Sequence, residues 1–224
     1  MCNVTILTPM RDAGQGFEAY RARLQSLRHP YAALRVVLIE GDSVDDTAVR
    51  AREWAAQDNR VSVVTCNTGK PRYGSVVNAD RFEGLAQVFN AGLDAIDQEW
   101  STHVLMLPCD IEYKPDLLGR LLADGVDMVS PIVWRAGIFY DTFAFSRNGQ
   151  HWPNFSQDRL GHYADNTLTE MDSIGGVLLM CVEVVQAGCR YSSIDVDRGL
   201  CREATERGFR VWADPRLSVF HPVS

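Results

Sequence analysis

The sequence predicts an α/β protein with an open, mainly parallel sheet flanked by helices, formed by a single domain of residues 1–224. Apolar runs of strand length alternate with helical patterns along most of the chain. A length of 224 residues fits one sizeable domain, and 46% hydrophobic residues fit a folded globular chain. Ligands of such sheets bind at the carboxyl ends of the strands, so polar residues that follow strands are the candidates for a functional site.

The first half of the chain carries the clearest alternation of elements. Strands are predicted at 3–8, 34–39, 61–66 and 103–107, and helices at 17–27, from Asp42-Ser43 through Trp54, at 81–97 and from Pro115 onward, with Pro30 ending the first helix. The run 34–39 is almost wholly apolar, which is typical of a strand covered on both faces. Residues 67–80 predict a long loop, and long loops in compact domains are usually functional or disordered.

The second half is less regular. After residues 126–133 the periodicity fades, and 134–170 is rich in aromatic residues. Two interpretations stay open for this region: an acceptor-binding platform that is partly mobile without ligand, or a hydrophobic cluster under a long loop. Beyond it the sequence predicts a strand at 175–181, a helix at 196–207 and two short closing strands at 209–213 and 217–220.

Composition excludes several classes of protein. A formal net charge of −7 disfavours an extended nucleic acid as a partner without excluding one. The six cysteines lack paired C-x-x-C spacing, which predicts reduced thiols in or near the core. No apolar run is long enough for a membrane span, and the first residues do not resemble a signal peptide, so we expect a cytoplasmic protein without a membrane anchor.

Polar residues follow several predicted strands. They are Thr8, Pro9 and Arg11 after the first strand, Glu40, Asp42 and Asp45 after the second, Asp110 and Glu112 after the fourth, and His221 near the chain end. Carboxylates and an imidazole beside cations suit a divalent metal that carries a diphosphate. Each residue also has a structural alternative: Asp42 as a helix N-cap, Asp110 and Glu112 as partners of a helix dipole, and His221 as a surface or core residue.

Two segments resemble a known family. The segment EGDSVDDT at Glu40–Thr47 resembles a signature of family 2 glycosyltransferases with the GT-A fold, and the stretch from Asp195 to Pro222 resembles their closing segment. The chain is also similar to the fungal mannan-polymerase type mannosyltransferases, in its ILTP start, in Asp172–Gly176 and in its final strand ending in His. These matches extend from Ile6 to His221.

The resemblance implies sugar transfer from a UDP- or GDP-sugar donor with Mn²⁺ or Mg²⁺ on the diphosphate, in a nucleotide-binding half (1–112) and an acceptor-binding half (113–224). It implies that Thr8, Pro9 and Arg11 line the nucleotide, that Glu40 and Asp42 contact base or ribose, that Arg81 lies near the diphosphate, and that Gly175 and Gly176 let the backbone approach the donor sugar. Asp110 takes the last position of the metal-binding Asp-x-Asp motif and His221 that of the terminal metal ligand. Pro108 replaces the first Asp, and Glu112 is the candidate substitute.

The catalytic candidates are carboxylates. Asp197 and Asp195 resemble the acidic pair before the closing helix of inverting family 2 enzymes, and Asp172 resembles the mannosyltransferase segment. Family 2 enzymes mostly invert the anomeric configuration and the fungal enzymes retain it, so the stereochemistry stays open, as does the acceptor. Two other functions are also open: a catalytically silent nucleotide-sugar-binding module, and a nucleotidyltransferase of sugar phosphates.

Overall fold

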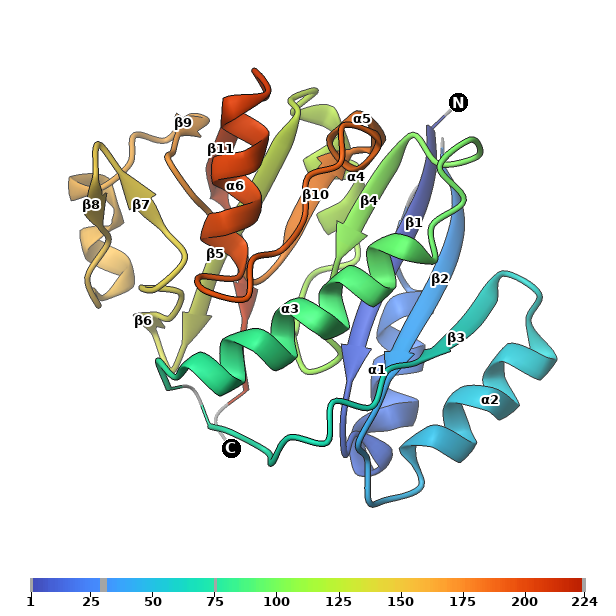
Figure 1. Cartoon of the computed structure of the whole chain (residues 1–224). Coiled ribbons are helices and arrows are strands. Elements are labelled where there is room, and N and C mark those ends of the chain that lie inside the picture. The colour runs from blue at the N-terminus through green and yellow to red at the C-terminus, as the bar shows by residue number, and fades with distance from the viewer. Residues whose placement is uncertain (1, 29–31, 75, 223–224) are drawn as a thin grey trace.

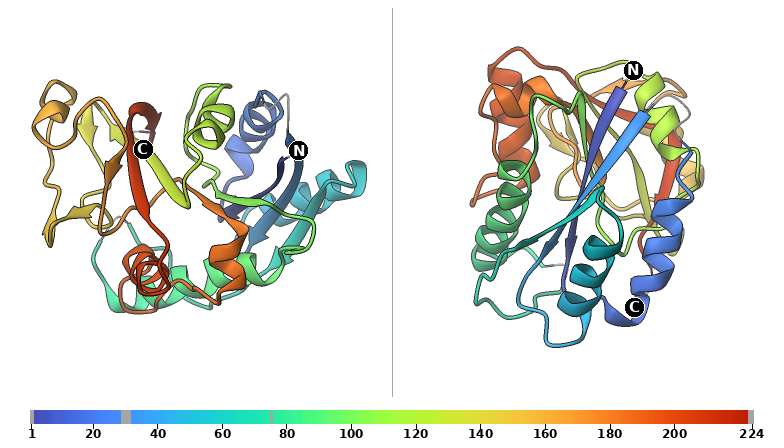
Figure 2. Two further views of the ribbon diagram at one scale, coloured as in Figure 1. Left: turned by 90° about the horizontal axis from the view of Figure 1, so that it is seen from above. Right: turned by 90° about the vertical axis from the view of Figure 1, so that its right-hand side faces the viewer.

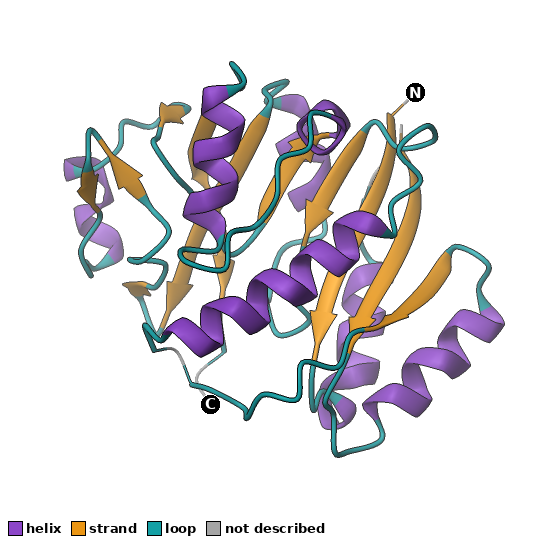
Figure 3. Cartoon of the chain, in the orientation of Figure 1, coloured by secondary structure: helices purple, strands orange, loops and turns teal. Residues whose placement is uncertain are grey.

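The computed structural model describes residues 2–28, 32–74 and 76–222, so the predicted helix end at Pro30 lies outside the described residues. The described chain forms one large sheet with helices on both faces (Figure 1 and Figure 3). The strand order is β3-β2-β1-β4-β10-β5-β11-β9, and β6 pairs with β5. The predicted α/β class with a mainly parallel central sheet is confirmed.

The first part of the sheet is wholly parallel. The central strand β1 (Cys2–Met10) pairs with β2 (Ala32–Glu40) on one side and with β4 (His103–Met106) on the other, and β3 (Val61–Thr65) pairs with β2. Residues 36–39 are all buried, as expected for a strand covered on both faces. The carboxyl ends of these strands lie at the same edge, at the bottom of Figure 1.

The second part of the sheet is mixed. Strands β5 (Met128–Arg135) and β11 (Val211–Phe220) run parallel, while β10 (Leu178–Cys181) is antiparallel between β4 and β5, and β9 (Thr169–Glu170) is antiparallel beside β11. The two closing strands predicted at 209–213 and 217–220 are therefore wrong as separate elements. They form one strand whose register is irregular between Asp214 and Ser218, where Pro215 lacks the N–H needed for a regular ladder.

Helices cover both faces of the sheet and bury two hydrophobic clusters. On one face α1 (Phe17–Gln25), preceded by the short η1 (Gly14–Gly16), packs with α2 (Thr47–Gln57) and α4 (Leu117–Ala123). On the other face α3 (Ala79–Asp94), α5 (Val182–Gln186) and α6 (Asp197–Glu206) pack against the sheet. Figure 2 shows α3 and α6 on the side of the sheet opposite α1 and α4.

Capping explains where α3 begins. The side chain of Asn78 accepts a hydrogen bond from the backbone N–H of Arg81 at 3.0 Å, which satisfies one of the unpaired donors of the first turn. The helix thus begins two residues before the predicted start at Arg81 and ends at Asp94 rather than Asp97. Its first half consequently lies beside the carboxyl edge of the sheet (Figure 1).

The aromatic region 134–170 is mostly a hydrophobic cluster. It contains β6 (Ile138–Phe139), the hairpin of β7 (Ser146–Arg147) and β8 (Gln150–His151), and the 3-10 helix η2 (Gln157–His162). Five aromatic side chains there are at most 5% exposed: Trp134, Phe139, Phe145, Trp152 and Phe155. The platform interpretation is wrong for these five, because their rings pack on one another, as in the stacked pair Phe139 and Phe155 at 4.9 Å.

The thiols follow the prediction. All six cysteines are free; Cys66, Cys189 and Cys201 are buried and the other three are half-buried. Among the described residues, no helix has both the length and the apolar character that crossing a membrane requires.

Candidate functional site

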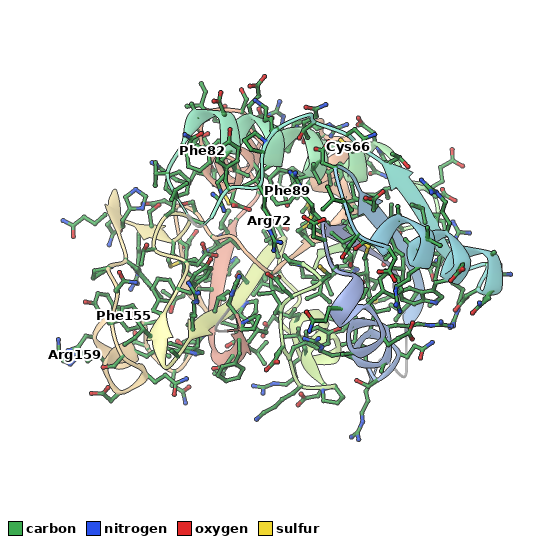
Figure 4. All side chains as sticks on the ribbon, turned by 90° about the horizontal axis from the view of Figure 1, so that it is seen from below. Cys66, Arg72, Phe82, Phe89, Phe155 and Arg159 are labelled. Atoms are coloured by element: carbon green, nitrogen blue, oxygen red, sulfur yellow. The ribbon has the colours of Figure 1, made fainter. Side chains whose placement is uncertain are left out.

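A cavity of about 800 Å³ opens at the edge of the sheet where the parallel strands end. Its walls come from both halves of the chain: the ends of β1, β2 and β5, the loops after β3 and β4, the first half of α3, the segment after β6 and the start of α6. Eight of the predicted site residues line it: Pro9, Arg11, Asp42, Arg81, Asp110, Gly176, Asp197 and His221. Figure 4 looks onto this edge and labels Arg72 and Phe89 near the middle of the view, with Phe155 and Arg159 to one side.

Asp110 and His221 meet at the cavity. The Nε2 atom of His221 lies 3.2 Å from Oδ2 of Asp110. The hydrogen bond to Asp110 raises the pKa of His221. Burial raises the pKa of Asp110, but the hydrogen bond and charge of His221 outweigh it, so this pKa lies below its usual value. Each shift favours the charged form of the group concerned, as expected for two side chains of opposite charge in contact.

A backbone bridge explains why these distant residues meet. The backbones of Glu112 and Phe220 exchange two hydrogen bonds of 2.8 Å, and His221 N–H donates to the carbonyl of Trp134 at 2.8 Å. These contacts fix the segment after β4 against the end of β11. The side chain of Glu112 is exposed and does not line the cavity, so its expected place beside the metal is not what the structure shows. Glu112 contributes its backbone to the site instead.

Basic side chains line the same cavity. They are Arg11, Lys70, Arg72, Arg81 and Arg135. The guanidinium of Arg11 donates to the carbonyl of Lys70 at 2.9 Å. Its buried Nε forms no hydrogen bond with a described residue and lies 3.9 Å from a carboxylate oxygen of Asp12. The ammonium of Lys70 lies 2.7 Å from a carboxylate oxygen of Glu83. A concentration of cations in an acidic protein suits an anionic ligand such as a diphosphate.

Asp42 holds the loop after β3. Its carboxylate accepts hydrogen bonds from the N–H of Thr68 at 2.8 Å, the hydroxyl of Thr68 at 2.6 Å and the N–H of Gly69 at 3.1 Å. The hydroxyl of Thr68 is the main cause that lowers the pKa of Asp42. The alternative of Asp42 as a helix N-cap is wrong, because the N-cap of α2 is Asp46. Asp42 therefore shapes the cavity wall as well as lining it.

Two carboxylates of the cavity lining lie against adjacent glycines, and of these two glycines Gly176 lines the cavity and Gly175 does not. A Cβ at Gly175 would lie 2.9 Å from Cγ of Asp197, and one at Gly176 would lie 2.7 Å from Oδ2 of Asp141. Burial raises the pKa of Asp197 to about 8, and the negative charge of Asp141 adds to the shift. Burial likewise raises the pKa of Asp141 to about 6, against the opposing charges of Arg81 and His221. The site thus holds two carboxylates that titrate near neutral pH.

Two predicted nucleotide contacts lie outside the cavity because side chains alternate along a strand. Pro9 and Ile39 line the cavity. Their neighbours Thr8 and Glu40 are buried: the hydroxyl of Thr8 accepts a hydrogen bond from Tyr20 at 2.7 Å, and Glu40 is 3% exposed. Thr8 and Glu40 were expected to contact the nucleotide, but the structure places both side chains outside the cavity lining.

Three other predicted residues also lie off the cavity lining. Asp172 accepts a hydrogen bond at 2.7 Å from the N–H of Gly149 in the β7–β8 turn, and its side chain is exposed. Asp195 forms an ion pair with Arg202 at 2.7 Å. The carbonyl of Gly175 accepts a hydrogen bond from the hydroxyl of Ser130 at 3.0 Å. Gly175 packs against the side chain of Asp197. Of the three catalytic candidates, the structure places only Asp197 in the cavity lining.

Sequence reasoning did not single out Asp141, Lys70, Arg72 or Arg135 as site residues. Lys70 and Arg72 lie in the predicted loop 67–80, whose basic residues were the available signal. Asp141 lies in the irregular region 134–170, where no strand pattern marks it as following a strand. Only the pairing of β6 with β5 brings Asp141 beside Gly176.

The turn after β1 cannot cradle a phosphate with its backbone. The N–H groups of Asp12, Ala13 and Gly14 donate to Ser43, Thr47 and Asp45, all from the segment between β2 and α2 or the start of α2. A phosphate-binding loop needs such N–H groups to point at the ligand. These three groups are already used within the protein.

The described residues offer few protein ligands for the expected metal ion. Among the described residues no group of three or more His, Cys, Asp or Glu side chains is arranged to hold an ion. The pair Asp110 and His221 supplies one oxygen and one nitrogen ligand. Mg²⁺ is commonly bound by one or two protein ligands together with substrate phosphates. The pair thus fits an ion that arrives with a diphosphate and does not fit an ion held by protein alone.

No protein-family model matches the sequence, and no curated protein matches it. Among the solved structures similar to this chain are those of S. aureus TarS, a family 2 glycosyltransferase. TarS 1-349 in complex with UDP-GlcNAc aligns with a TM-score of 0.64 and 10% identity over 99% of this chain and 59% of that one. The same fragment with UDP aligns with a TM-score of 0.58 and 10% identity over 99% of this chain and 61% of that one. The chain has the GT-A fold.

At 10% identity this likeness establishes the fold alone. The chain spans 59% of the length of the UDP-GlcNAc-bound fragment, so TarS contains structure that this chain does not match. The fold confirms the GT-A expectation drawn from Glu40–Thr47. The resemblance to fungal mannan-polymerase type enzymes stays a sequence-based expectation.

Proposed function

We propose that the protein is a glycosyltransferase that moves a sugar from a nucleoside diphosphate donor, a UDP- or GDP-sugar, to an acceptor hydroxyl. The observation that carries the proposal is the pairing of Asp110 with His221 at 3.2 Å on the wall of a basic cavity at the carboxyl edge of a GT-A sheet. The solved structures with this fold include TarS bound to UDP-GlcNAc and to UDP.

The donor side of the mechanism follows from charge. Departure of the nucleoside diphosphate leaves negative charge on its terminal phosphate, and the cations of Arg11, Lys70 and Arg72 stabilise that charge. Asp110 and His221 would hold a Mn²⁺ or Mg²⁺ ion, which supplies further charge neutralisation on the diphosphate. Pro9 and Asp42 line the cavity and are the proposed contacts of the nucleoside.

On the acceptor side Asp197 is the proposed general base. The acceptor oxygen forms a bond to the anomeric carbon, the bond to the diphosphate oxygen breaks, and Asp197 takes the hydroxyl proton. A base whose pKa lies near the working pH combines the ionised form with a useful affinity for protons, and burial brings Asp197 to about 8. Direct displacement of this kind inverts the anomeric configuration. Asp172, the candidate tied to retention, lies off the cavity lining.

Of the other functions, the structure weighs against a nucleotidyltransferase and leaves a silent module to be tested. The N–H groups after β1 are used within the protein, which disfavours phosphate binding there. Pro108 lines the cavity and takes the position of the first Asp of the family motif. The loss of this carboxylate favours the silent module, because it removes a potential metal ligand. Donor binding without turnover is the signature of the silent module.

The decisive experiment measures binding and hydrolysis of sugar nucleotides. UDP-glucose, UDP-N-acetylglucosamine and GDP-mannose are titrated by calorimetry with Mn²⁺ and with EDTA, and release of UDP or GDP is followed over hours. We expect one of them to bind and to be hydrolysed slowly when Mn²⁺ is present. The Asp110→Asn variant should lose at least about tenfold in Mn²⁺-dependent affinity, since it removes a charged ligand.

A matched control is Asp94→Asn at the far end of α3. Its exposed carboxylate pairs with Arg190 at 3.4 Å and does not line the cavity, so its affinity and turnover should equal those of the unchanged protein. Equal behaviour of Asp110→Asn and Asp94→Asn would remove the proposed metal role. Binding by the unchanged protein with no hydrolysis and no transfer to any acceptor would favour the silent module.

A further inference from the structure

Asp141 is a cavity residue that the proposed mechanism does not use. It follows β6 in a turn fixed by two backbone hydrogen bonds: Tyr140 N–H donates to Val133 at 2.9 Å, and Phe145 N–H donates to the carbonyl of Asp141 at 3.1 Å. It lines the cavity together with Gly176 and Asp197. The turn therefore presents its carboxylate at a defined place on the wall.

One oxygen of this carboxylate has no partner. Oδ2 of Asp141 is buried and accepts no hydrogen bond from any described residue. Leaving a buried acceptor unpaired destabilises a folded protein, and native proteins do so rarely. In a ligand cavity, such an oxygen marks a place where the missing hydrogen-bond donor comes with the ligand.

The backbone is specialised to leave room for this oxygen. Gly176 has a φ of +71°, and a Cβ there would lie 2.7 Å from Oδ2 of Asp141. Any other residue would strain the backbone and displace the carboxylate. A Cβ at Gly175 would lie 2.5 Å from Cβ of Ala144 and 2.9 Å from Cγ of Asp197. The two adjacent glycines thus lie against two carboxylates of different origin, one from the β6 turn and one from α6.

The surroundings of Asp141 also differ from those of an ordinary ion pair. Positive charges of Arg81 and His221 and the N–H of Ala144 favour its ionised form, while burial opposes it. None of these groups forms a hydrogen bond to the buried oxygen. The nearby charges thus offset the cost of burying this carboxylate only in part. A hydrogen bond from a hydroxyl group would stabilise it further.

We propose that Asp141 reads the donor sugar, by accepting a hydrogen bond from one hydroxyl of the hexose that is transferred. This inference rests on the proposed function and deepens it. Asp197, which lies against Gly175, acts as the base for the acceptor hydroxyl. Asp141, which lies against Gly176, binds the sugar ring. Its role is to position and select the sugar, so it acts on the hexose and not on the nucleoside diphosphate.

The test compares each sugar nucleotide with its bare nucleotide. Calorimetry with Mn²⁺ gives the affinity of the unchanged protein and of Asp141→Ala for UDP-glucose, UDP-N-acetylglucosamine and GDP-mannose, and for UDP and GDP. We expect Asp141→Ala to bind the preferred sugar nucleotide roughly tenfold or more weakly, as for loss of a hydrogen bond to a charged group. Its affinity for the bare nucleotide should be unchanged.

Deoxy analogues identify the hydroxyl. Removing the hydroxyl that Asp141 accepts should weaken binding to the unchanged protein but cause no further loss in Asp141→Ala, whereas removing any other hydroxyl should affect both proteins equally. The Asp141→Asn variant, which keeps an oxygen acceptor without the charge, should bind with intermediate affinity.

The outcomes separate this inference from the proposed function. An unchanged protein that binds none of the sugar nucleotides and neither bare nucleotide would overturn the proposed function and this inference with it. If the unchanged protein binds a sugar nucleotide and Asp141→Ala binds it equally well, only the role of Asp141 is overturned. An equal loss of affinity for sugar nucleotide and bare nucleotide would also overturn it, since Asp141 would then not act on the sugar.

Discussion

The Nε2 atom of His221 lies 3.2 Å from Oδ2 of Asp110, at the point where the end of β11 meets the loop after β4. Under the proposed function these two side chains are the protein ligands of a metal ion, and among the described residues no third His, Cys, Asp or Glu side chain completes a group that could hold an ion. A cation at this pair therefore needs oxygens from a phosphate to complete its coordination.

Metal and nucleotide should consequently stabilise the protein together and not separately. We expect Mn²⁺ alone to shift the melting temperature little, UDP alone to shift it modestly, and both to raise it by more than the sum, because binding to the folded state stabilises it by mass action. In His221→Ala the combined shift should decrease to the sum of the separate ones. Differential scanning fluorimetry with EDTA controls measures this, and a large shift with Mn²⁺ alone would contradict a two-ligand site.

Asp197 should make stability depend on pH. Burial raises its pKa in the folded protein to about 8, above its usual value near 4, so between these values the folded protein binds more protons than the unfolded chain. Its contribution is fully present below about pH 4 and is lost as the pH rises through about 8. Asp197→Asn should match the unchanged protein near pH 3.5 and exceed its free energy of unfolding by on the order of 5 kcal/mol at pH 8.5. Urea unfolding at several pH values tests this, and a difference that does not vary with pH would refute it.

Gly176 should tolerate no side chain, for two separable reasons. Gly176→Ala places a Cβ at positive φ and 2.7 Å from Asp141, whereas Gly188→Ala has a similar φ of +84° with nothing within 4 Å. We expect Gly188→Ala to cost about 1 kcal/mol of unfolding free energy for the backbone alone, and Gly176→Ala to cost more. Adding Asp141→Ala to Gly176→Ala should recover the excess. Denaturant unfolding measures both free energies. An equal loss of unfolding free energy in Gly176→Ala and Gly188→Ala would show that Asp141 does not clash with a Cβ at position 176.

Asp42 should keep the loop after β3 ordered. It accepts three hydrogen bonds from Thr68 and Gly69, so Asp42→Ala leaves these donors without their acceptor. Hydrogen exchange of the Thr68 and Gly69 amides should become at least about tenfold faster, while amides in β1 keep their protection. Affinity for the nucleotide should fall as well, since Lys70 and Arg72 are carried by the same loop. Unchanged exchange at both amides would mean that other contacts hold the loop.

Strand ends were the most informative part of the sequence. Apolar runs and their alternation with helical patterns predicted β1 to β4 and the edge at which Asp42 and Asp110 lie, because parallel strands expose their carboxyl ends together. The same reasoning missed that Thr8 and Glu40 point away from the cavity. Strand periodicity places neighbours on opposite faces, and one residue of uncertainty at a strand end decides which of two neighbours faces the ligand.

The aromatic region shows where sequence patterns fail. Its strands are two residues long, too short to carry a periodic signal, so neither the β6 pairing nor the position of Asp141 was visible. A ring-rich segment is compatible with a ligand platform or with a core, and burial decides between them. Here most rings are buried against one another.

By itself the sequence determined the α/β class, the carboxyl edge as the place of the candidate site, and the residue types gathered there, because these depend on local periodicity and on which residues follow a strand. Tertiary structure alone decided that Glu112 serves through its backbone, that Asp172 and Asp195 are tied to partners off the cavity, and that Asp141 shares the glycine pair with Asp197. Those relations depend on contacts between segments far apart in the chain, and such contacts leave no spacing pattern in the sequence.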